Sequence, residues 1–296
     1  DLRGDGFDDI LIGDPGASAA YVYAGAESGP FLSRTLNGPG HFGSSVALGG
    51  DIDADGFDDL VVGAPTDNSG IGSALIIYGS DSGPGDEAML VGDIEGDLFG
   101  SNVAIVGSTT GDGSADVAVL LSGRGEGLVM VFDTNGSGFR MNELRPAGVT
   151  TGFGAALVGL DHNADGFYDV AVGSPSSGSG KVDLYMGSPS GASPFPMGLY
   201  LPKGQAATFG GALAAGTQPG EDADFLVVGD VGQSRVMLYA GTTDIDGDGL
   251  QDIKEWPLGI NPFLVDTDGD GLTDFTEWGP GMLPQDSDGD RVINAL

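Results

Sequence analysis

A nine-residue stretch with acidic side chains at alternating positions carries the clearest chemical signal in the chain. Positions 1, 3, 5 and 9 are carboxylates and position 7 offers its main-chain carbonyl: Asp51, Asp53, Asp55, Asp59 and Phe57. Gly56 at position 6 allows the chain to reverse sharply. Carboxylates this close repel one another unless a cation neutralises them, and a hard divalent cation takes about six to eight oxygen ligands. The pattern therefore predicts a calcium loop at residues 51–59.

Residues 161–169 repeat this pattern with one neutral oxygen in place of a carboxylate. The predicted ligands keep the same spacing: Asp161, Asn163, Asp165, the carbonyl of Phe167, and Asp169. An asparagine amide oxygen is also a ligand that calcium accepts. Because this acidic pattern is itself a calcium-loop signature, two independent occurrences favour metal binding over an acidic surface turn.

Residues 1–9 align with these loops but have an arginine at position 3. The ligand positions that keep a carboxylate are Asp1, Asp5 and Asp9. This set leaves open whether the loop is a calcium site or a metal-free turn. Arg3-Gly4-Asp5 also spells a tripeptide that some adhesion receptors bind, but the loop pattern alone explains its presence.

Two further stretches align with still fewer ligands. Residues 108–116 have carboxylates at two ligand positions, Asp112 and Asp116, and residues 216–224 at one, Asp224. Because calcium needs more oxygens than these, we expect both to be metal-free turns. In chain order, the five stretches are called loops one to five.

The loops lie in the middle of a longer repeat. Complete copies begin with a Phe-Gly pair at Phe42, Phe99, Phe153 and Phe209, with spacings of 57, 54 and 56 residues. One copy contains four short apolar runs that predict β-strands: Ser45–Leu48, Asp59–Val62, Ala74–Tyr78 and Met89–Val91. Four strands in about 55 residues are typical of a β-propeller blade, whereas a β-sandwich would not explain the regular period. We count five copies, the first of them truncated.

The order of motifs within a copy carries a family resemblance. Phe42-Gly43, then the acidic loop, then Gly63-Ala64-Pro65 resembles the FG-GAP repeat of integrin α-subunit β-propellers and their bacterial relatives. The resemblance covers residues 1–241. It implies an all-β propeller of four-stranded blades, usually about seven, with a role in adhesion. About two blades are then expected upstream of residue 1, because closing the ring removes exposed strand edges.

After Tyr239 the pattern changes to 12-residue loops. Two loops 22 residues apart carry the ligands Asp244, Asp246, Asp248, Leu250, Asp252 and Glu255, then Asp266, Asp268, Asp270, Leu272, Asp274 and Glu277. The order is that of an EF-hand, but Pro257 and Pro262 interrupt the helices that an EF-hand needs. Residues 242–296 instead resemble thrombospondin type 3 calcium repeats, which implies a stalk stiffened by ions. A third, incomplete loop has Asp286, Asp288 and Asp290.

The composition restricts partners and location. A formal charge of −34, from 44 acidic and 10 basic residues, excludes nucleic acid as a natural partner, because lysine and arginine clusters hold phosphate backbones. The chain has no cysteine, so calcium would have to provide the cross-links that disulfides provide in other extracellular proteins. Calcium loops in extracellular modules bind at about 10⁻⁴ to 10⁻³ M. We therefore expect an extracellular chain, secreted or at the cell surface, or a periplasmic one. No apolar run reaches the about 18 residues of a membrane span.

Residues suited to catalysis are scarce. The two histidines, His41 and His162, are expected to be solvated turn residues and not bases. The sequence has no nucleophile elbow, zinc-protease motif or phosphate-binding loop. Carboxylate pairs could cleave glycosides, but calcium would lower their pKa and remove them from proton transfer. We expect no enzyme activity and no catalytic residues.

Three hypotheses on function follow. The favoured one is an extracellular adhesion or interaction scaffold, in which propeller loops on a calcium-stiffened stalk meet a protein or glycan ligand. The second is a structural subunit of a cell-surface assembly, which would self-associate. The third is the non-catalytic part of a secreted hydrolase or lyase, whose catalytic residues would lie outside this sequence.

Overall fold

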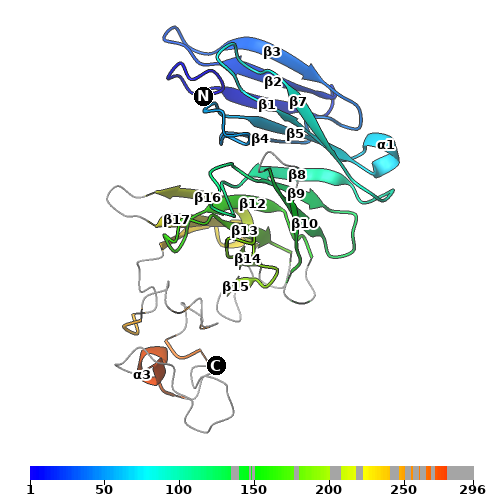
Figure 1. Ribbon diagram of the computed structural model, residues 1–296. Helices are drawn as coiled ribbons and strands as arrows, with labels where there is room; N and C mark the ends of the chain where they lie inside the picture. Colours follow the sequence, from blue (N-terminus) through cyan, green and yellow to red (C-terminus); the bar gives the residue numbers. More distant parts are fainter. Residues whose placement is uncertain are drawn as a thin grey trace.

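The chain is all-β in the part that the structure describes. A computed structural model describes residues 1–134, 140–146, 148, 151–176, 180–200, 208–217, 223–240, 247–250, 255, 260, 265–267 and 271–278. Within these residues, 18 strands form five antiparallel sheets that follow one another along the chain (Figure 1). We number them sheets one to five. The predicted all-β class is confirmed.

Each sheet is a meander in which consecutive strands pair. Sheet one contains β1 (Ile10–Asp14), β2 (Ala19–Ala24) and β3 (Phe31–Asn37). Sheet two contains β4 (Ser45–Leu48), β5 (Leu60–Ala64), β6 (Ser73–Ile77) and β7 (Glu87–Val91). Sheet three contains β8 (Phe99–Ile105), β9 (Val117–Leu121), β10 (Leu128–Asp133) and β11 (Arg140–Leu144). Sheet four contains β12 (Ala156–Leu160), β13 (Asp169–Ser174), β14 (Lys181–Tyr185) and β15 (Met197–Tyr200). Sheet five contains β16 (Phe209–Thr217), β17 (Asp224–Asp230) and β18 (Arg235–Ala240).

The strands of sheet two match the predicted ones, with bounds that differ by at most two residues. Loops two to five join the first and second strands of sheets two to five, and loop one directly precedes β1. The strands of sheet one therefore correspond to the second, third and fourth strands of a complete copy. Sheet five corresponds to the first, second and third.

The Phe-Gly pair has a packing role in the sheets it begins. Its phenylalanine packs edge to face on an aromatic ring of the third strand, with centroids 5.8, 6.4 and 6.1 Å apart, in three sheets: Phe99 on Phe132, Phe153 on Tyr185 and Phe209 on Tyr239. Its glycine allows close approach of the neighbouring sheet. A Cβ atom on Gly100 would lie 2.3 Å from the carbonyl oxygen of Ser73 in sheet two, so this contact needs glycine.

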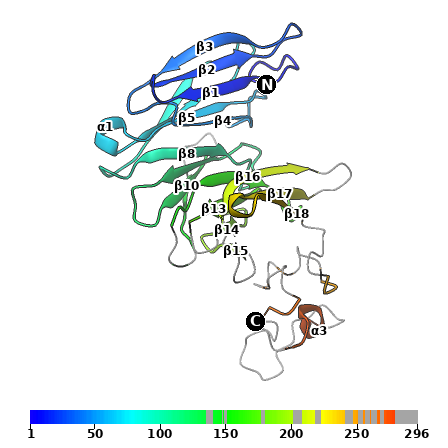
Figure 2. The same ribbon diagram turned by 180° about the vertical axis from the view of Figure 1, so that it is seen from behind.

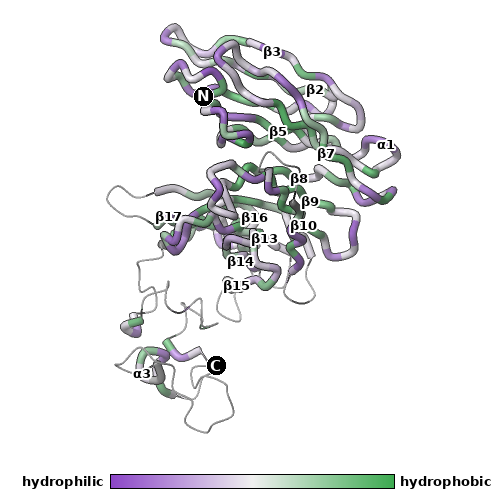
Figure 3. The backbone as a smooth tube through the Cα atoms, in the orientation of Figure 1, coloured by the Kyte–Doolittle hydropathy of each residue, from purple (hydrophilic) through white to green (hydrophobic). Residues whose placement is uncertain are grey.

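Adjacent sheets pack face to face, so the inner strands are apolar on both faces. In β5, Leu60 and Val62 share a core cluster with Val22 of sheet one, whereas Val61 shares one with Val117 of sheet three. Figure 3 shows hydrophobic stretches along strands such as β5 and β8, and hydrophilic stretches mostly in the loops. Burial on both faces explains why the sequence of β5 is a continuous apolar run, with no alternation of polar and apolar residues.

Sheet one lies at one end of the molecule (Figures 1 and 2). Sheets one and five, the first and last along the chain, each leave apolar side chains exposed on one face. Ile10 and Ile12 of β1 are 46% and 48% exposed, although the corresponding Leu60 and Val62 of β5 are fully buried. Val236 and Leu238 of β18 are 70% and 58% exposed. The described sheets therefore do not form a closed ring.

Short turns complete the described structure. The segment α1 (Asp67–Gly70) contains two residues with left-handed backbone, Asn68 and Ser69, and is a turn more than a helix. A 3₁₀ turn, η1 (Val231–Gln233), precedes β18, and α3 (Asp274–Trp278) begins within the last part of the second C-terminal loop. Among the described residues, none of the helices has the length and apolar character to span a membrane.

Candidate metal loops

Loop two, at residues 51–59, is folded by its own carboxylates. Asp51 accepts hydrogen bonds from the N–H groups of Asp55 and Gly56 at 3.0 and 2.7 Å, and Asp55 accepts one from Phe57 at 3.0 Å. Ala54 and Gly56 have the positive φ angles, 61° and 96°, that the tight turn requires. This turn places the side chains of positions 1, 3 and 9 on one side of the loop.

The aspartate at position 9 fastens the loop to its sheet. Asp59 is fully buried and accepts the N–H of Ile52 at 2.6 Å and the N–H of Gly79, which follows β6, at 2.7 Å. The side chain of Ile52 is fully buried as well. Position 9 therefore ties the start of the loop to the end of the third strand.

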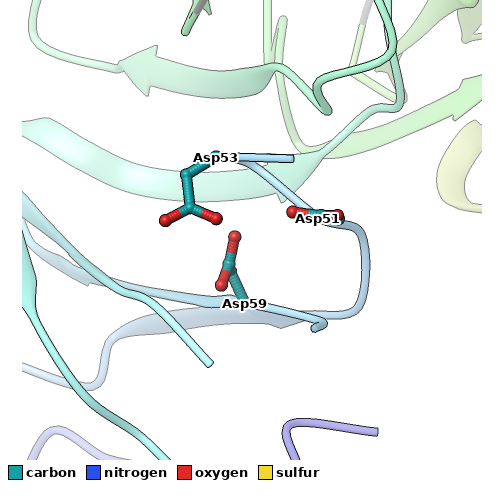
Figure 4. Close-up of side chains that lie close together, drawn as sticks. All are labelled: Asp51, Asp53 and Asp59. Atoms are coloured by element: carbon teal, nitrogen blue, oxygen red, sulfur yellow. The ribbon is translucent and has the colours of Figure 1, made fainter. Parts of the chain in front are cut away.

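Three carboxylates of loop two converge. One oxygen from each of Asp51, Asp53 and Asp59 lies within 4.8 Å of the others, and their carboxylates lie close together in Figure 4. No other group of this kind occurs among the described aspartate, glutamate, histidine and cysteine residues. Asp55, also a predicted ligand, lies outside this group of three and accepts the N–H of Phe57.

The electrostatics of this group favour a cation. Burial, followed by the charges of Asp55 and Asp51, raises the pKa of Asp53. Burial also raises the pKa of Asp59 to about 6, with smaller contributions from Asp53 and Asp51. A calcium ion would reverse these shifts, because it favours the ionised form. Carboxylate oxygens plus the Phe57 carbonyl are the hard donors that calcium takes, so the residues fit the ion.

Loop four, at residues 161–169, has the same turn. Asp161 accepts the N–H groups of Asp165 and Gly166 at 3.1 and 3.0 Å, and Asp165 accepts that of Phe167 at 2.9 Å. The amide nitrogen of Asn163 donates to Asp165 at 2.9 Å. Positions 3 and 5 of loop four are thus joined by a direct side-chain hydrogen bond.

Position 9 of loop four repeats the anchoring seen in loop two. Asp169 accepts the N–H groups of His162 and Gly187 at 3.2 and 2.8 Å. Burial raises its pKa to about 7, and the charges of Asp165 and Asp161 add to the effect. Burial likewise raises the pKa of Asp161.

Loop one, at residues 1–9, contains a cation of its own. A terminal nitrogen of Arg3 lies 2.6 Å from the carboxylate of Asp5 and donates to the carbonyl of Gly25 at 2.8 Å. Asp1 and Asp9 otherwise make the same turn bonds as their counterparts in loop two. The guanidinium of Arg3 is thus engaged within the loop, and its side chain is 23% exposed.

Loop three, at residues 108–116, keeps the turn with hydroxyl groups in place of carboxylates. Ser108 Oγ accepts the N–H of Asp112 at 3.0 Å and donates to the Asp112 carboxylate, also at 3.0 Å. Thr109 donates its N–H to Asp116 at 2.8 Å and its hydroxyl to the same carboxylate oxygen. Burial raises the pKa of Asp116 to about 6.

The expectation that His162 is solvated is wrong. Its side chain is only 1% exposed, and burial lowers its pKa to about 4. The reason is its place in the loop, because position 2 is buried in loops one to four: Leu2, Ile52, Thr109 and His162. Position 2 of loop five, Thr217, is exposed. His41 is exposed, as expected, and its Nδ1 lies 2.7 Å from the hydroxyl of Thr66.

The described residues of the C-terminal loops adopt the same turn. Asp266 accepts the N–H of Gly271 at 2.8 Å, and the buried Asp274 accepts that of Thr267 at 2.9 Å. Asp248 accepts the N–H of Leu250 at 2.7 Å, and its other oxygen accepts the N–H of Phe275 in the second loop, also at 2.7 Å. Leu272 at position 7 is exposed and Glu255 at position 12 is buried.

The remaining predicted C-terminal ligands lie outside the described residues: Asp244, Asp246, Asp252, Asp268, Asp270, Asp286, Asp288, Asp290 and the side chain of Glu277.

Three glycines that anchor the loops were missed by sequence reasoning. Gly25, Gly79 and Gly187 each follow the strand that corresponds to the third strand of a complete copy, and they donate to the position 9 aspartate of loops one, two and four. A glycine at this place in three copies is a signal that the sequence does contain. The link itself joins segments 16 to 20 residues apart and is visible only in the fold.

Comparison with known proteins supports one repeat directly. The FG-GAP repeat family matches residues 42–77, which include the Phe-Gly pair, loop two, and β4 to β6. An FG-GAP repeat is therefore present in the chain. No curated protein matched the sequence.

Solved structures show weaker similarity. A functionally unknown protein from Desulfotomaculum acetoxidans DSM 771 is 11% identical and superposes with a TM-score of 0.46 over 74% of this chain and 58% of its own. The Tc holotoxin pore of Photorhabdus luminescens, in a mutant form, is 16% identical with a TM-score of 0.40 over 78% of this chain and 11% of its own. The chain thus spans less than two thirds of either protein.

Proposed function

We propose that the chain is a calcium-binding extracellular scaffold, built from FG-GAP blades and continued by thrombospondin type 3-like calcium repeats. The observation that carries the proposal is the convergence of Asp51, Asp53 and Asp59, with carboxylate oxygens within 4.8 Å of one another and raised pKa values for two of the three. Such a group is unfavourable when it is fully ionised and empty, and favourable around a divalent cation.

The two complete loops would hold the ions of the sheet region. Loop two offers its four carboxylates and the carbonyl of Phe57, and loop four offers Asp161, Asn163, Asp165, Asp169 and the carbonyl of Phe167. Loop one would stay free of metal, because the Arg3 guanidinium already neutralises Asp5. Calcium supplies charge neutralisation here, so it would stabilise the fold and take no part in a reaction.

The exposed end faces support a ring with more blades than the five described sheets. Ile10 and Ile12 on sheet one, and Val236 and Leu238 on sheet five, occupy positions that a neighbouring sheet covers elsewhere in the row. Covering the part of each such side chain that is still exposed is favourable by about 1 kcal/mol or more. Further blades of the same kind would cover both faces, as the resemblance to seven-bladed propellers implies.

An extracellular location and a protein or glycan ligand belong to the same proposal. FG-GAP repeats typically occur in extracellular proteins, and the absence of cysteine fits a fold braced by calcium. The loops that join the sheets would present the binding surface. Self-association in calcium, measured by light scattering after size-exclusion chromatography, would instead favour the structural subunit of an assembly.

Calcium counting tests the proposal. Isothermal titration calorimetry on the chelator-treated chain should show calcium binding, and anomalous scattering from crystals should locate an ion among Asp51, Asp53 and Asp59. Density for an ion at Asp112 with none at Asp51 would overturn the scheme. Absence of any calcium binding at millimolar concentration would overturn the function itself.

A further inference from the structure

One main-chain hydrogen bond recurs at all four junctions between neighbouring sheets. The carbonyl at position 1 of a loop accepts an N–H from the following loop: Asp58 to Asp1 at 3.4 Å, Ala115 to Asp51 at 2.7 Å, Tyr168 to Ser108 at 2.9 Å and Asp224 to Asp161 at 2.8 Å. The loops are therefore linked in a row along one rim of the sheets.

The junction between loop two and sheet three has a second hydrogen bond, donated by a side chain. The hydroxyl of the buried Thr134, which follows β10, donates to the carbonyl of Ile52 at 2.6 Å and to that of Ala115 at 3.2 Å. Positions 1 and 2 of loop two thus both accept hydrogen bonds from sheet three. Ala115 itself lies in loop three, which has too few ligands for a metal.

The junction between loop four and sheet five is strengthened by a side chain. Asp224 donates its N–H to the carbonyl of Asp161, and its carboxylate accepts the N–H of Asp161 at 2.9 Å. The hydroxyl of Thr217 donates to the other oxygen of the same carboxylate at 2.6 Å. Asp224 therefore holds the main chain of the first ligand of loop four from both sides.

Position 1 connects the ion to the junction. Its carboxylate would ligate calcium and also accepts the turn N–H groups, while its carbonyl accepts the bond from the next sheet. An ion that fixes this residue also fixes the acceptor of the bond across the junction. Because opening that bond would then require distortion of the metal site, the ion and the junction stabilise each other.

We propose that calcium in loops two and four clamps each loop to the following sheet, and that Asp224 is a positioning residue for the calcium site of loop four. The inference rests on the calcium binding proposed above. It makes each site a two-sheet unit, whereas the loop sequence alone suggests an ion that braces one hairpin.

Hydrogen exchange followed by nuclear magnetic resonance tests the clamp. The N–H groups of Ala115 and Asp224 lie in metal-free loops, so direct ligation cannot protect them. Calcium should slow their exchange about tenfold or more, and should leave Asp116, whose N–H bonds to Gly107 of its own sheet, much less affected. Asp53→Ala should remove the effect at Ala115 only, and Asp165→Ala the effect at Asp224 only.

Calorimetry on Asp224 variants tests the positioning role. Asp224→Ala should weaken calcium binding at loop four about tenfold, because it removes the bond to the N–H of Asp161. Asp224→Asn keeps an acceptor oxygen and should bind within about threefold of the unmodified chain. Glu87→Ala, at an exposed position on β7, removes one charge elsewhere and serves as the control.

The outcomes separate the two proposals. If the unmodified chain binds no calcium, the proposed function is overturned and the clamp with it. If calcium binds but Ala115 and Asp224 exchange at unchanged rates, the clamp alone is overturned. If Asp224→Asn weakens binding as much as Asp224→Ala, Asp224 acts by charge and its positioning role is overturned.

Discussion

Loops two and three have nearly the same backbone but hold it by different means. In loop two, the Asp51 carboxylate accepts the N–H groups of positions 5 and 6, and in loop three the Ser108 hydroxyl accepts them. Both loops bond the N–H of position 2 to the aspartate at position 9. The turn therefore does not depend on a cation.

What differs is the charge that remains after the turn has formed. Loop two has two more carboxylates at ligand positions, Asp51 and Asp53, where loop three has Ser108 and Thr110. Hydroxyl groups satisfy the turn at no electrostatic cost, whereas the carboxylates add repulsion that only a cation removes. Loop three thus shows how the same turn folds without the carboxylates of the proposed metal site.

Among the tests of the difference between loops two and three, removal of calcium should change the free energy of unfolding most. An ion stabilises the folded state by about 2.7 kcal/mol at a hundredfold excess over Kd, so the loss from loops two and four together is about 5 kcal/mol. Thermal melts in calcium and in excess chelator should differ by many degrees. Magnesium should restore little, because it holds its water ligands tightly. Identical melts in calcium and chelator would refute a role for metal in stability.

Substitutions in the two loops should behave differently. Asp53→Ala should lower the calcium count by one and cost about 3 kcal/mol in calcium, but cost little in chelator because it removes a repelling charge. Asp112→Ala should leave the count unchanged and cost about 1 kcal/mol in both conditions, from lost bonds to Ser108 and Ser114. Calorimetric titration and thermal melts measure both quantities. An equal loss of calcium in the two variants would contradict the distinction.

Arg3→Asp should convert loop one into a metal loop. The change completes the carboxylates at positions 1, 3, 5 and 9 and removes the guanidinium from Asp5. The calcium count should rise by one, with up to about 2.7 kcal/mol of added stability in calcium. Arg3→Ala is the matched control, since it removes the cation without adding a ligand. An unchanged count in Arg3→Asp would show that carboxylates at these four positions are not sufficient for metal binding.

The pH dependence of stability should change sign with calcium. Without an ion, the pKa values of Asp59 and Asp116 are about 6 and that of Asp169 about 7, above the ordinary 3.8. Carboxyls with raised pKa contribute stability that is fully present below about pH 4 and is lost as the pH rises through 6 to 7. In chelator, stability should therefore increase by about 1 kcal/mol from about pH 7.5 to 6. In calcium it should decrease, because protons compete with the ion.

Titration of His162 has the opposite effect on the pH dependence of stability, so a His162 variant serves as the control. Its pKa, lowered from 6.5 to about 4, means that its contribution to stability is lost as the pH falls through this range. His162→Leu places at this position the residue found as Leu2 in loop one. The acid stabilisation in chelator should be larger in this variant. A smaller one would show that the buried carboxyls do not control the trend.

Substitutions at position 4 of loops two and three should change the free energy of unfolding least. Ala54 of loop two has a φ of 61°, and Gly111 of loop three has one of 72° at the same position. Because alanine is strained there, Ala54→Gly should raise the free energy of unfolding by up to about 1 kcal/mol, measured by urea titration. Gly111→Ala should destabilise by more, since its Cβ would lie 2.8 Å from the Phe167 ring. Destabilisation by Ala54→Gly would show that the strain is offset elsewhere.

Local patterns predicted the local structure well. The apolar runs of sheet two, the Phe-Gly starts and the loops between first and second strands are encoded in neighbouring residues, so spacing was sufficient to find them. The convergence of Asp51, Asp53 and Asp59 also follows from their places in one turn.

Features that depend on contact between sheets were not predictable. The inward direction of position 2 buries His162 because sheets pack on both faces, which the loop sequence does not reveal. Asp224 was assigned only to its own loop, although its carboxylate bonds to Asp161 of the preceding sheet. In the same way, nothing in the sequence near Lys181 indicated that it would be buried 2.9 Å from Asp183. Each of these requires knowledge of which surface covers the residue.

The anchoring aspartate at position 9 has a consequence for how such chains change over evolutionary time. Asp9, Asp59, Asp116 and Asp169 make the bond to position 2 whether or not the other ligand positions carry carboxylates. Inheritance of the turn is thereby separated from inheritance of the metal site. If the carboxylates bind calcium as proposed, substitutions at positions 1, 3 and 5 would remove or restore the ion while the bond from position 9 keeps the turn in place. Descendants of one ancestral repeat can thus differ in how many ions they carry while they keep the same architecture.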